Sequence, residues 1–361
     1  MEIKLLFFLH FISLLVCVIG SNNSPGIFIF GDSIFDAGNN HYNKNCTSQA
    51  DFLPYGSTFF HHPTGRFTNG RTVPDFISEF IGIPFQKSFM EIEIDIRNGT
   101  RNGYPLNGIN FASGGSGVLR ATNNYSGSTP LQVQVQQFET LVEQNHIDRK
   151  PIQKSLFFLE SGSNDIANYF NPFDPPKLTP DAYIESMVSE VHNFLDTIYK
   201  LGARRVALFG LGPVGCVPAR TLLPGATVTK CYGKVNKMVK NYNMGLENLV
   251  KEIPSKYHGA VGVYGAVYNT VQHFRANPKR YGFVDVESAC CGYGTLGGEM
   301  QCGKEGYKMC KNPNQYLFWD FLHPSERTYM LVSKALWAGK HSKIRPFNLK
   351  TLVNITLPHI I

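Results

Sequence analysis

Five short apolar runs, each three to five residues long, constrain the fold of this chain more than any other feature. Apart from Asn110 they are apolar, and they lack the alternation of a half-exposed strand, which is typical of parallel strands covered by helices on both faces. Segments with helical periodicity separate them, so an α/β fold with a central parallel sheet is predicted. The runs comprise residues 27–30, 109–111, 156–159, 206–209 and 260–264.

Amphipathic segments between these runs are predicted to be helices. The clearest begins behind Thr179, a good N-cap residue, has Pro180 in its first turn and stops before Gly202. Pro254 is expected to end another helix, because proline lacks the N–H that a helix interior needs. No repeat or linker interrupts the pattern, so residues 21–361 are expected to form one domain. The predicted helical segments are 72–80, 131–145, 180–200, 235–253 and 325–339.

Residues 1–20 have the pattern of a cleaved signal peptide. Lys4 supplies a positive charge, residues 5–19 form an almost unbroken apolar run, and Gly20 is a small residue at the expected cleavage site. The run is shorter than a transmembrane helix needs, and no later apolar stretch is long enough to span a bilayer. The mature chain is therefore predicted to be secreted to the extracellular space.

Five N-glycosylation sequons agree with this compartment, because each becomes a usable acceptor in a secreted protein. They begin at Asn22, Asn45, Asn98, Asn124 and Asn354.

The cysteines are expected to form disulfides in an oxidising compartment. Cys17 leaves with the signal peptide, so seven of the eight cysteines remain and at least one lacks a partner within the chain. Cys216 and Cys231 flank a proline-containing loop and are expected to pair, whereas the isolated Cys46 is the candidate for the unpaired thiol. The other four are expected to form two bridges of undecided connectivity: Cys290, Cys291, Cys302 and Cys310.

The charge distribution and the motifs exclude several classes of function. The net charge is +7, and no Lys/Arg run is longer than Arg204–Arg205, which argues against a nucleic-acid-binding surface. Neither C-x-x-C nor a Cys/His zinc spacing occurs, so no metal site is expected. Residues 210–215 fit G-x-G-x-x-G, but Pro213 interrupts the required helix and Lys230 stands where an acid would bind ribose. No nucleotide cofactor is therefore expected.

Polar groups suited to acyl transfer follow three predicted strands and precede the last predicted helix. Ligands of an open parallel sheet bind beyond the carboxyl ends of its strands. Ser33 follows the first strand, the glycine-rich loop 112–117 follows the second, and Asn164 follows the third. Asp320 can accept from Nδ1–H of His323, three residues later, which leaves Nε2 free to take a proton from a serine. These groups supply a nucleophile, a base, its orienter and oxyanion donors.

The same residues lie in four ordered blocks that resemble those of the plant GDSL esterase/lipase family, a branch of the SGNH hydrolases. The blocks are residues 31–40, 110–117, 162–165 and 320–324, and Ile34 stands where the family name has Leu. The resemblance extends over nearly the whole mature chain. It implies a flavodoxin-like, three-layer α/β/α sandwich around a mostly parallel five-stranded sheet, with an ester substrate and no cofactor.

By position, the resemblance implies that Ser33 is the nucleophile, His323 its base and Asp320 the orienter of that base. Asp36 and Asp165, each beside a block, are the rival carboxylates. The predicted function is a secreted serine ester hydrolase that works through an acyl-enzyme. The alternatives are an acyltransferase with the same triad, or a catalytically silent secreted defence or binding protein.

The resemblance also implies three oxyanion donors, namely the backbone N–H groups of Ser33 and Gly114 and the side-chain amide of Asn164. Gly115 is the alternative to Gly114, since a single sequence does not separate them. The acyl and alcohol specificities stay open, a monomer is expected, and no nucleic-acid partner or transmembrane segment is expected.

Overall fold

A five-stranded sheet, in the order β1-β2-β3-β4-β9, forms the centre of the computed structural model, which describes residues 25–173 and 177–357. Four strands are parallel, and the fifth pairs antiparallel with β4. They are β1 (Ile27–Gly31), β2 (Leu156–Glu160), β3 (Arg205–Phe209), β4 (Val261–Gly265) and β9 (Ile344–Arg345). The predicted mostly parallel sheet is confirmed, whereas the expected signal peptide and the Asn22 sequon lie outside the described residues.

The strand predicted at residues 109–111 is wrong, because this segment forms a single bridge with β1 instead of a ladder. The N–H of Ile29 donates to the carbonyl of Ile109 at 2.9 Å, and the N–H of Phe111 donates to the carbonyl of Ile29 at 2.7 Å. The pairing does not extend into a ladder, because the N–H of Gly31 donates to the side chain of Gln134 at 2.9 Å and not to this segment. The segment still lies at the free edge of β1. The fifth strand is instead β9, whose two residues carry no periodicity that sequence reasoning could detect.

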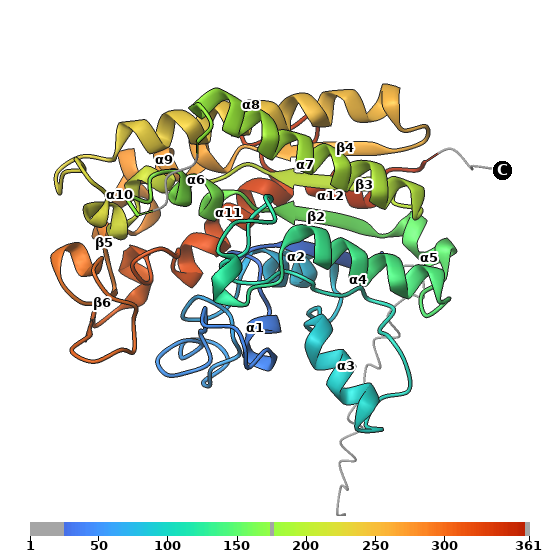
Figure 1. The fold of residues 1–361 in the computed structure, drawn as a ribbon, viewed down its shortest axis with the longest axis horizontal. Coiled ribbons are helices and arrows are strands. Elements are labelled where there is room, and N and C mark those ends of the chain that lie inside the picture. Colours follow the sequence, from blue (N-terminus) through green and yellow to red (C-terminus); the bar gives the residue numbers. More distant parts are fainter. Residues whose placement is uncertain (1–24, 174–176, 358–361) are drawn as a thin grey trace, which may run out of the picture.

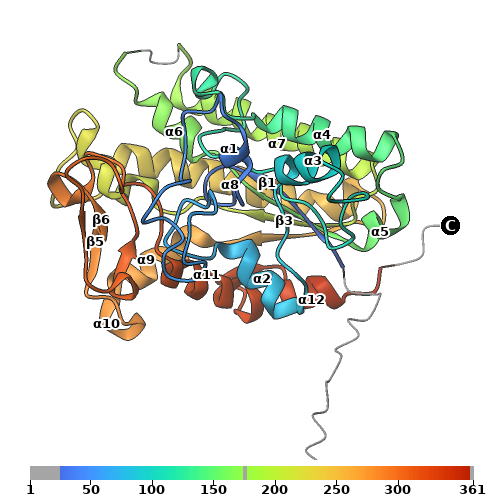
Figure 2. The same ribbon diagram turned by 90° about the horizontal axis from the view of Figure 1, so that it is seen from below.

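Helices cover both faces of the sheet, as in the expected three-layer sandwich (Figure 2). Alternate β1 side chains point to opposite faces, so that Phe28 and Phe30 join one core cluster and Ile29 joins the other. One face packs against α4 (Leu131–Glu143), α7 (Pro180–Lys200) and α8 (Gly233–Lys256). The other packs against α2 (Val73–Ile81), α9 (Val267–Ala276), α11 (Glu326–Ala338) and α12 (Leu349–Asn354).

Capping residues set the starts of the main helices. The Thr179 hydroxyl accepts from the N–H of Ala182 at 3.3 Å, which satisfies one of the free donors at the start of α7. Ser325 caps α11 in the same way. The expectation that Pro254 ends a helix is wrong, because α8 continues through it to Lys256. Since proline sits in the last turn, its missing N–H removes only one hydrogen bond near a helix end.

Short elements lie outside the sheet and its main helices, several of them at the left of Figure 1, where the parallel strands have their carboxyl ends. A two-stranded parallel sheet pairs β5 with β8, and an antiparallel one pairs β6 with β7. These elements are α1 (Asn39–Tyr42), α3 (Phe89–Arg97), α5 (Arg149–Lys154), α6 (Ser163–Tyr169), α10 (Pro278–Tyr281), β5 (Asp285–Ala289), β6 (Cys291–Gly292), β7 (Lys308–Met309) and β8 (Tyr316–Phe318).

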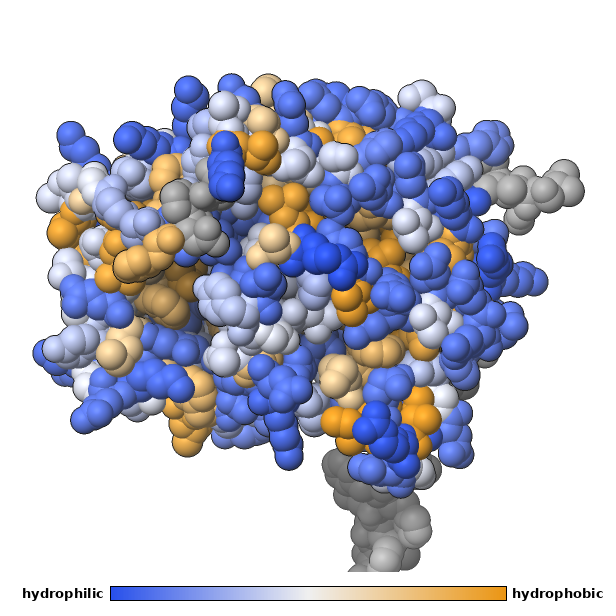
Figure 3. All heavy atoms as spheres, in the orientation of Figure 1, coloured by the Kyte–Doolittle hydropathy of each residue, from blue (hydrophilic) through white to orange (hydrophobic). Residues whose placement is uncertain are grey.

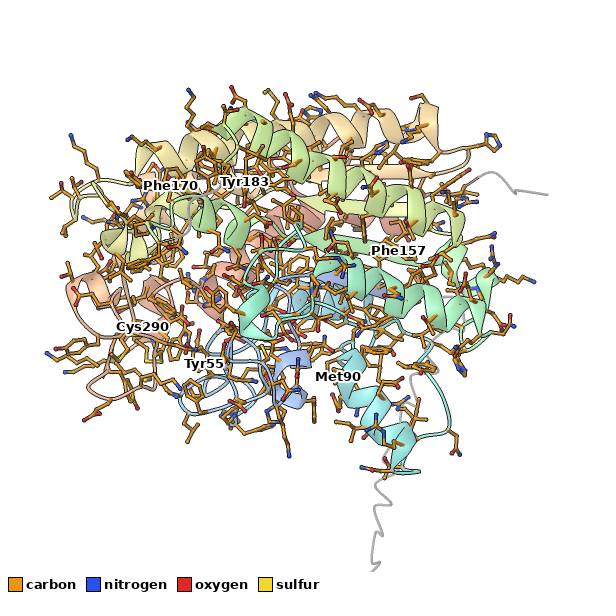
Figure 4. All side chains as sticks on the ribbon, viewed as in Figure 1. Tyr55, Met90, Phe157, Phe170, Tyr183 and Cys290 are labelled. Carbon is orange, nitrogen blue, oxygen red and sulfur yellow. A yellow bond between two sulfur atoms is a disulfide. The ribbon has the colours of Figure 1, made fainter. Side chains whose placement is uncertain are left out.

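Three disulfides join described residues of the chain. Cys216 and Cys231 are bonded, as expected, and the connectivity left open by the sequence is Cys290–Cys310 and Cys291–Cys302. Cys46 has a free, buried thiol. The disulfides of Cys290 and Cys291 pack in a small core that includes Tyr55 and Trp319. Figure 4 places Tyr55 and Cys290 at the same end of the molecule. The disulfides thus brace the loops around that end.

Within residues 25–173 and 177–357, none of the helices combines the length and the apolar character needed to cross a membrane.

Candidate active site

Ser33 reaches the edge of the sheet because β1 ends in a tight turn. The backbone N–H of Ile34 donates to Asp32 Oδ1 at 3.0 Å, and that of Phe35 donates to the Asp32 carbonyl at 3.2 Å. These bonds hold the turn, so that Ser33 stands just beyond the carboxyl end of the strand, where parallel sheets bind their ligands. Its side chain is 9 % exposed.

Ser33, His323 and Asp320 form a continuous chain of hydrogen bonds. Ser33 Oγ lies 2.8 Å from His323 Nε2, and His323 Nδ1 lies 2.8 Å and 2.9 Å from the two carboxylate oxygens of Asp320. A carboxylate only accepts, so Nδ1 carries the proton and Nε2 accepts from the serine hydroxyl. The sequence-predicted residues are therefore brought together across 290 positions of the chain, in the arrangement that deprotonates a serine.

Asp320 is fully buried, and its carboxylate accepts hydrogen bonds from two backbone N–H groups and from the Tyr55 hydroxyl in addition to that from His323 Nδ1. Its Oδ1 accepts from the backbone N–H groups of Leu322 and His323, at 2.9 Å and 2.7 Å, as well as from the ring. Its Oδ2 accepts from the Tyr55 hydroxyl at 2.6 Å. Burial, followed by the charge of Asp320, raises the pKa of Tyr55 well above its usual value. Tyr55 was missed by sequence reasoning, since nothing in its turn-rich neighbourhood signals a partner 265 residues away.

Phe67 covers one side of the His323 ring, with the ring centroids 5.1 Å apart. The loop that carries it also contains Arg66, whose guanidinium makes two 2.8 Å hydrogen bonds to the buried carboxylate of Asp75. Arg71 is held in turn by Glu326. Both arginines therefore stabilise the loop, and the adjacent turn residues His61 and His62 are exposed.

Two of the three expected oxyanion donors have a hydrogen to offer. The backbone N–H of Ser33 has no acceptor among the described residues. The side-chain amide of Asn164 donates one hydrogen to the carbonyl of Ser116 at 2.9 Å, which leaves its second hydrogen. The choice of Gly114 does not fit, because its N–H already donates to Asp36 Oδ2 at 2.9 Å. The N–H of Gly115 has no acceptor within the described part of the chain, and Gly115 takes the positive φ of 82° that suits glycine.

The rival carboxylates hold loops and do not contact His323. Asp36 accepts from the N–H groups of Gly38 and Asn39, both at 2.7 Å, and from that of Gly114. Burial raises the pKa of Asp36 to about 6, and these N–H donors oppose the shift. Asp165 accepts from the glycine-rich loop that ends near Leu119, and burial raises its pKa too. Neither side chain is placed to orient the imidazole.

Asp32 and Glu160 form a second acidic pair that sequence reasoning missed. Both are buried and adjacent, since the backbone N–H of Asp32 donates to the carbonyl of Glu160 at 3.2 Å, and Asp32 Oδ2 and Glu160 Oε2 have no hydrogen-bond partner within the described residues. Burial raises the pKa of Asp32 to about 6. Burial and the charge of Asp32 raise the pKa of Glu160 well above its usual value. Two neighbouring buried carboxyl groups cannot both ionise at low cost, and burial favours the protonated form of Glu160.

The decoy motif at residues 210–215 leads into a single 3-10 turn, Val214–Cys216, and not into the helix that a dinucleotide site requires. Among the residues the structure describes, no group of three or more His, Cys, Asp or Glu side chains could hold a metal ion.

A flavodoxin-like sandwich that carries a serine, a histidine–aspartate pair and an asparagine at its strand ends defines an SGNH-type hydrolase. Comparisons with known proteins agree. The family model described as GDSL-like Lipase/Acylhydrolase matches residues 27–336. The chain is 64 % identical to GDSL esterase/lipase 6 of Arabidopsis thaliana, with 94 % of each chain covered. It is 32 % identical to GDSL esterase/lipase 5 of the same plant (93 % of this chain, 89 % of the relative). It is also 32 % identical to a GDSL lipase of Tanacetum cinerariifolium, with 92 % and 89 % covered.

The chain therefore belongs to the GDSL esterase/lipase family, and it is an ester hydrolase of that type.

Proposed function

We propose that the protein is a secreted serine esterase in which Ser33, His323 and Asp320 act as a catalytic triad. The hydrogen-bond chain from Ser33 Oγ through the imidazole to Asp320, 2.8 Å at each step, carries this proposal. His323 Nε2 takes the hydroxyl proton while Oγ attacks the ester carbonyl, and Asp320 stabilises the imidazolium. The alcohol leaves with that proton, and water then attacks the acyl-enzyme with His323 again as base.

The oxyanion that forms during this attack is bound by three N–H donors. These are the backbone N–H of Ser33, the free hydrogen of the Asn164 side-chain amide and the backbone N–H of Gly115 in place of Gly114. The proposal is supported by the absence of a competing acceptor for the two backbone groups within the described residues. Donors that are already oriented stabilise the developing charge without reorganisation.

Secretion as a single domain, residues 21–361, is part of the same proposal, after removal of residues 1–20. The three disulfides support it, because such bonds persist in oxidising compartments. The four sequons that lie within the described residues support glycosylation, since their asparagines are all exposed. These are Asn45, Asn98, Asn124 and Asn354.

Hydrolysis of p-nitrophenyl esters by the purified mature chain tests the function, with Ser33→Ala as the matched variant. We expect Ser33→Ala to lose at least about 10³-fold in kcat while it keeps its fold by circular dichroism. A fluorophosphonate should label the wild type on Ser33 and leave the variant unmodified. Activity that survives in Ser33→Ala would contradict the proposal. Product analysis with glycerol added distinguishes release to water from transfer to an alcohol.

A further inference from the structure

An apolar pocket with a cavity volume of about 90 Å³ lies next to the turns that carry Ser33 and His323. Residues adjacent in sequence to the proposed catalytic groups line it: Ile34 follows Ser33, and Leu322 and Pro324 flank His323. A chain attached to the reacting carbonyl can therefore enter the pocket directly.

The far wall of the pocket is aliphatic and aromatic. It comes from the sheet face covered by α9 and α11, where Phe209 of β3 faces Val271 of α9 and Val332 and Leu336 of α11. All four side chains are at least nine-tenths buried. Figure 3 shows that hydrophobic atoms also gather on the molecular surface at the left end, where Figure 1 has the strand ends. The pocket is thus suited to an acyl tail that leaves water for an apolar interior.

Four polar side chains, Glu160, Ser163, Thr328 and Tyr329, interrupt this apolar lining, and Glu160 and Tyr329 each have a buried oxygen without a hydrogen-bond partner within the described residues. Glu160 ends β2, whose alternation points it to the same face as Phe158, and it lines the pocket. Tyr329 of α11 lines it too, is 2 % exposed, and its hydroxyl has no hydrogen-bond partner within the described residues. Leaving a buried hydroxyl without a partner is unfavourable, so this one is placed to bind a polar atom of a ligand.

Glu160 lies at the end of the pocket nearest Ser33. Its carbonyl accepts from the backbone N–H of Asp32, the residue that precedes Ser33, at 3.2 Å. A neutral carboxyl group can both donate to and accept from a hydroxyl. A ligand oxygen here would belong to one of the first carbons of the acyl chain.

We propose that the pocket selects an acyl group that carries a hydroxyl on carbon 2 or 3 and a short apolar tail, with Glu160 and Tyr329 as the residues that recognise this hydroxyl. The inference rests on the esterase function proposed above. The tail is short because an apolar cavity of ~150 Å³ just holds the six carbons of benzene, so about 90 Å³ holds roughly four. A hydroxylated acyl chain of four to six carbons or so fits both the polar mouth and the apolar end.

The test compares p-nitrophenyl 3-hydroxyhexanoate with p-nitrophenyl hexanoate. We expect the wild type to favour the hydroxylated ester by roughly tenfold in kcat/KM, because the plain ester leaves Tyr329 without a partner. Glu160→Leu should bring the ratio close to one, and Tyr329→Phe should lower it about threefold. The exposed Glu252→Gln should leave the ratio as it is. A ratio that is equal in all four proteins overturns the proposal, and Tyr329→Phe decides it if Glu160→Leu does not fold.

A pocket-filling variant tests where the tail lies. Val271→Phe should lower the ratio of hexanoate to acetate hydrolysis by about tenfold or more, whereas the same change at Val284, which is 74 % exposed, should not. An unchanged ratio in folded Val271→Phe would overturn the placement of the acyl chain.

Binding to Ser33→Ala separates this inference from the esterase function. By titration calorimetry, we expect this variant to bind ethyl 3-hydroxyhexanoate about tenfold more tightly than ethyl hexanoate. Equal binding overturns the inference even when the wild type hydrolyses both esters. If the wild type hydrolyses no ester and the binding preference is present, the esterase proposal fails and the pocket assignment stands.

Discussion

Tyr55 donates a 2.6 Å hydrogen bond to Asp320 Oδ2 across 265 residues of sequence. The bond joins the turn-rich segment after β1 to the turn that carries His323. It also places an aromatic ring beneath the carboxylate, where Tyr55 packs edge-on against Trp319 at a centroid distance of 6.1 Å. Asp320 is thus held both by the Tyr55 hydroxyl and by the N–H groups of its own turn. Together they restrain the imidazole of His323 more than the turn alone would.

Tyr55→Phe should lower kcat by about 3- to 30-fold, because it removes one hydrogen bond to a charged acceptor and leaves the ring in place. Steady-state kinetics with p-nitrophenyl acetate, beside a thermal unfolding curve, measures both effects. A variant with wild-type kcat, or with a change in KM alone, would show that the hydroxyl does not help to orient Asp320.

Asp320→Asn should lose ~10²–10⁴ in kcat at pH 7 and unfold near the wild-type temperature. The amide cannot stabilise the imidazolium and favours the wrong tautomer, whereas the backbone N–H donors still hold the turn. Ser33→Ala and His323→Ala should each lose at least as much, and the double variant should be little worse than either. The assignment of the orienter would fail if Asp320→Asn stayed within about threefold of wild type while folded Asp165→Asn or Asp36→Asn was inactive.

Asn164→Ala should lower kcat by ~10²–10³ with little change in KM, because its free N–H acts on charge that develops only in the transition state. The same change also removes the hydrogen bond to the Ser116 carbonyl, so the unfolding temperature is measured in parallel. An effect confined to KM would mean that Asn164 binds the substrate and does not stabilise the oxyanion.

Wild-type stability should fall as the pH rises from about 4 to above 6. Burial raises the pKa of Asp32 and of Asp36 to about 6, so the folded state holds protons that the unfolded chain has released. The free energy of unfolding should therefore be highest below the unfolded pKa and decline by at most about 3 kcal/mol per group across this window. Urea denaturation at four pH values measures it.

Asp32→Asn should reduce that decline, since an amide does not titrate. The exposed Asp181→Asn serves as the control and should keep the wild-type slope. A slope that is the same in all three proteins would show that Asp32 does not ionise in this range.

Replacing both Cys291 and Cys302 by Ala should cost roughly 3 kcal/mol of stability, as expected for a closed loop of this size. It should also lower kcat, because this bridge packs in the small core with Tyr55 and Trp319, next to Asp320. Cys46→Ala, which removes a thiol outside any disulfide, is the control. Loss of stability with wild-type kcat would separate the bridge from the site.

Local pattern was sufficient for much of the fold. Both the start of α7 at Pro180 and its end at Lys200 follow from capping and breaker residues that act within one turn. Local pattern also predicted four of the five strands correctly, because their apolar side chains leave water only when both faces of the sheet are covered. The prediction of a strand at residues 109–111 was wrong because the length of the pairing depends on how the flanking chain turns. The strand β9 was not predicted because two residues are too few to show a periodic pattern.

The chain by itself also determined which chemistry is possible. Ser33, Asn164 and the Asp320–His323 pair stand at strand ends, and parallel strands must bring those ends to one edge. Only the tertiary structure decided that the N–H of Gly114 donates to Asp36 and that the Tyr55 hydroxyl donates to Asp320. It also decided that Glu160 and Tyr329 line an apolar pocket. Hydrogen bonds and cavities join residues that are distant in sequence, and their geometry depends on the packing of the whole core. Local propensities extend over a few residues, so they carry no information about such partners.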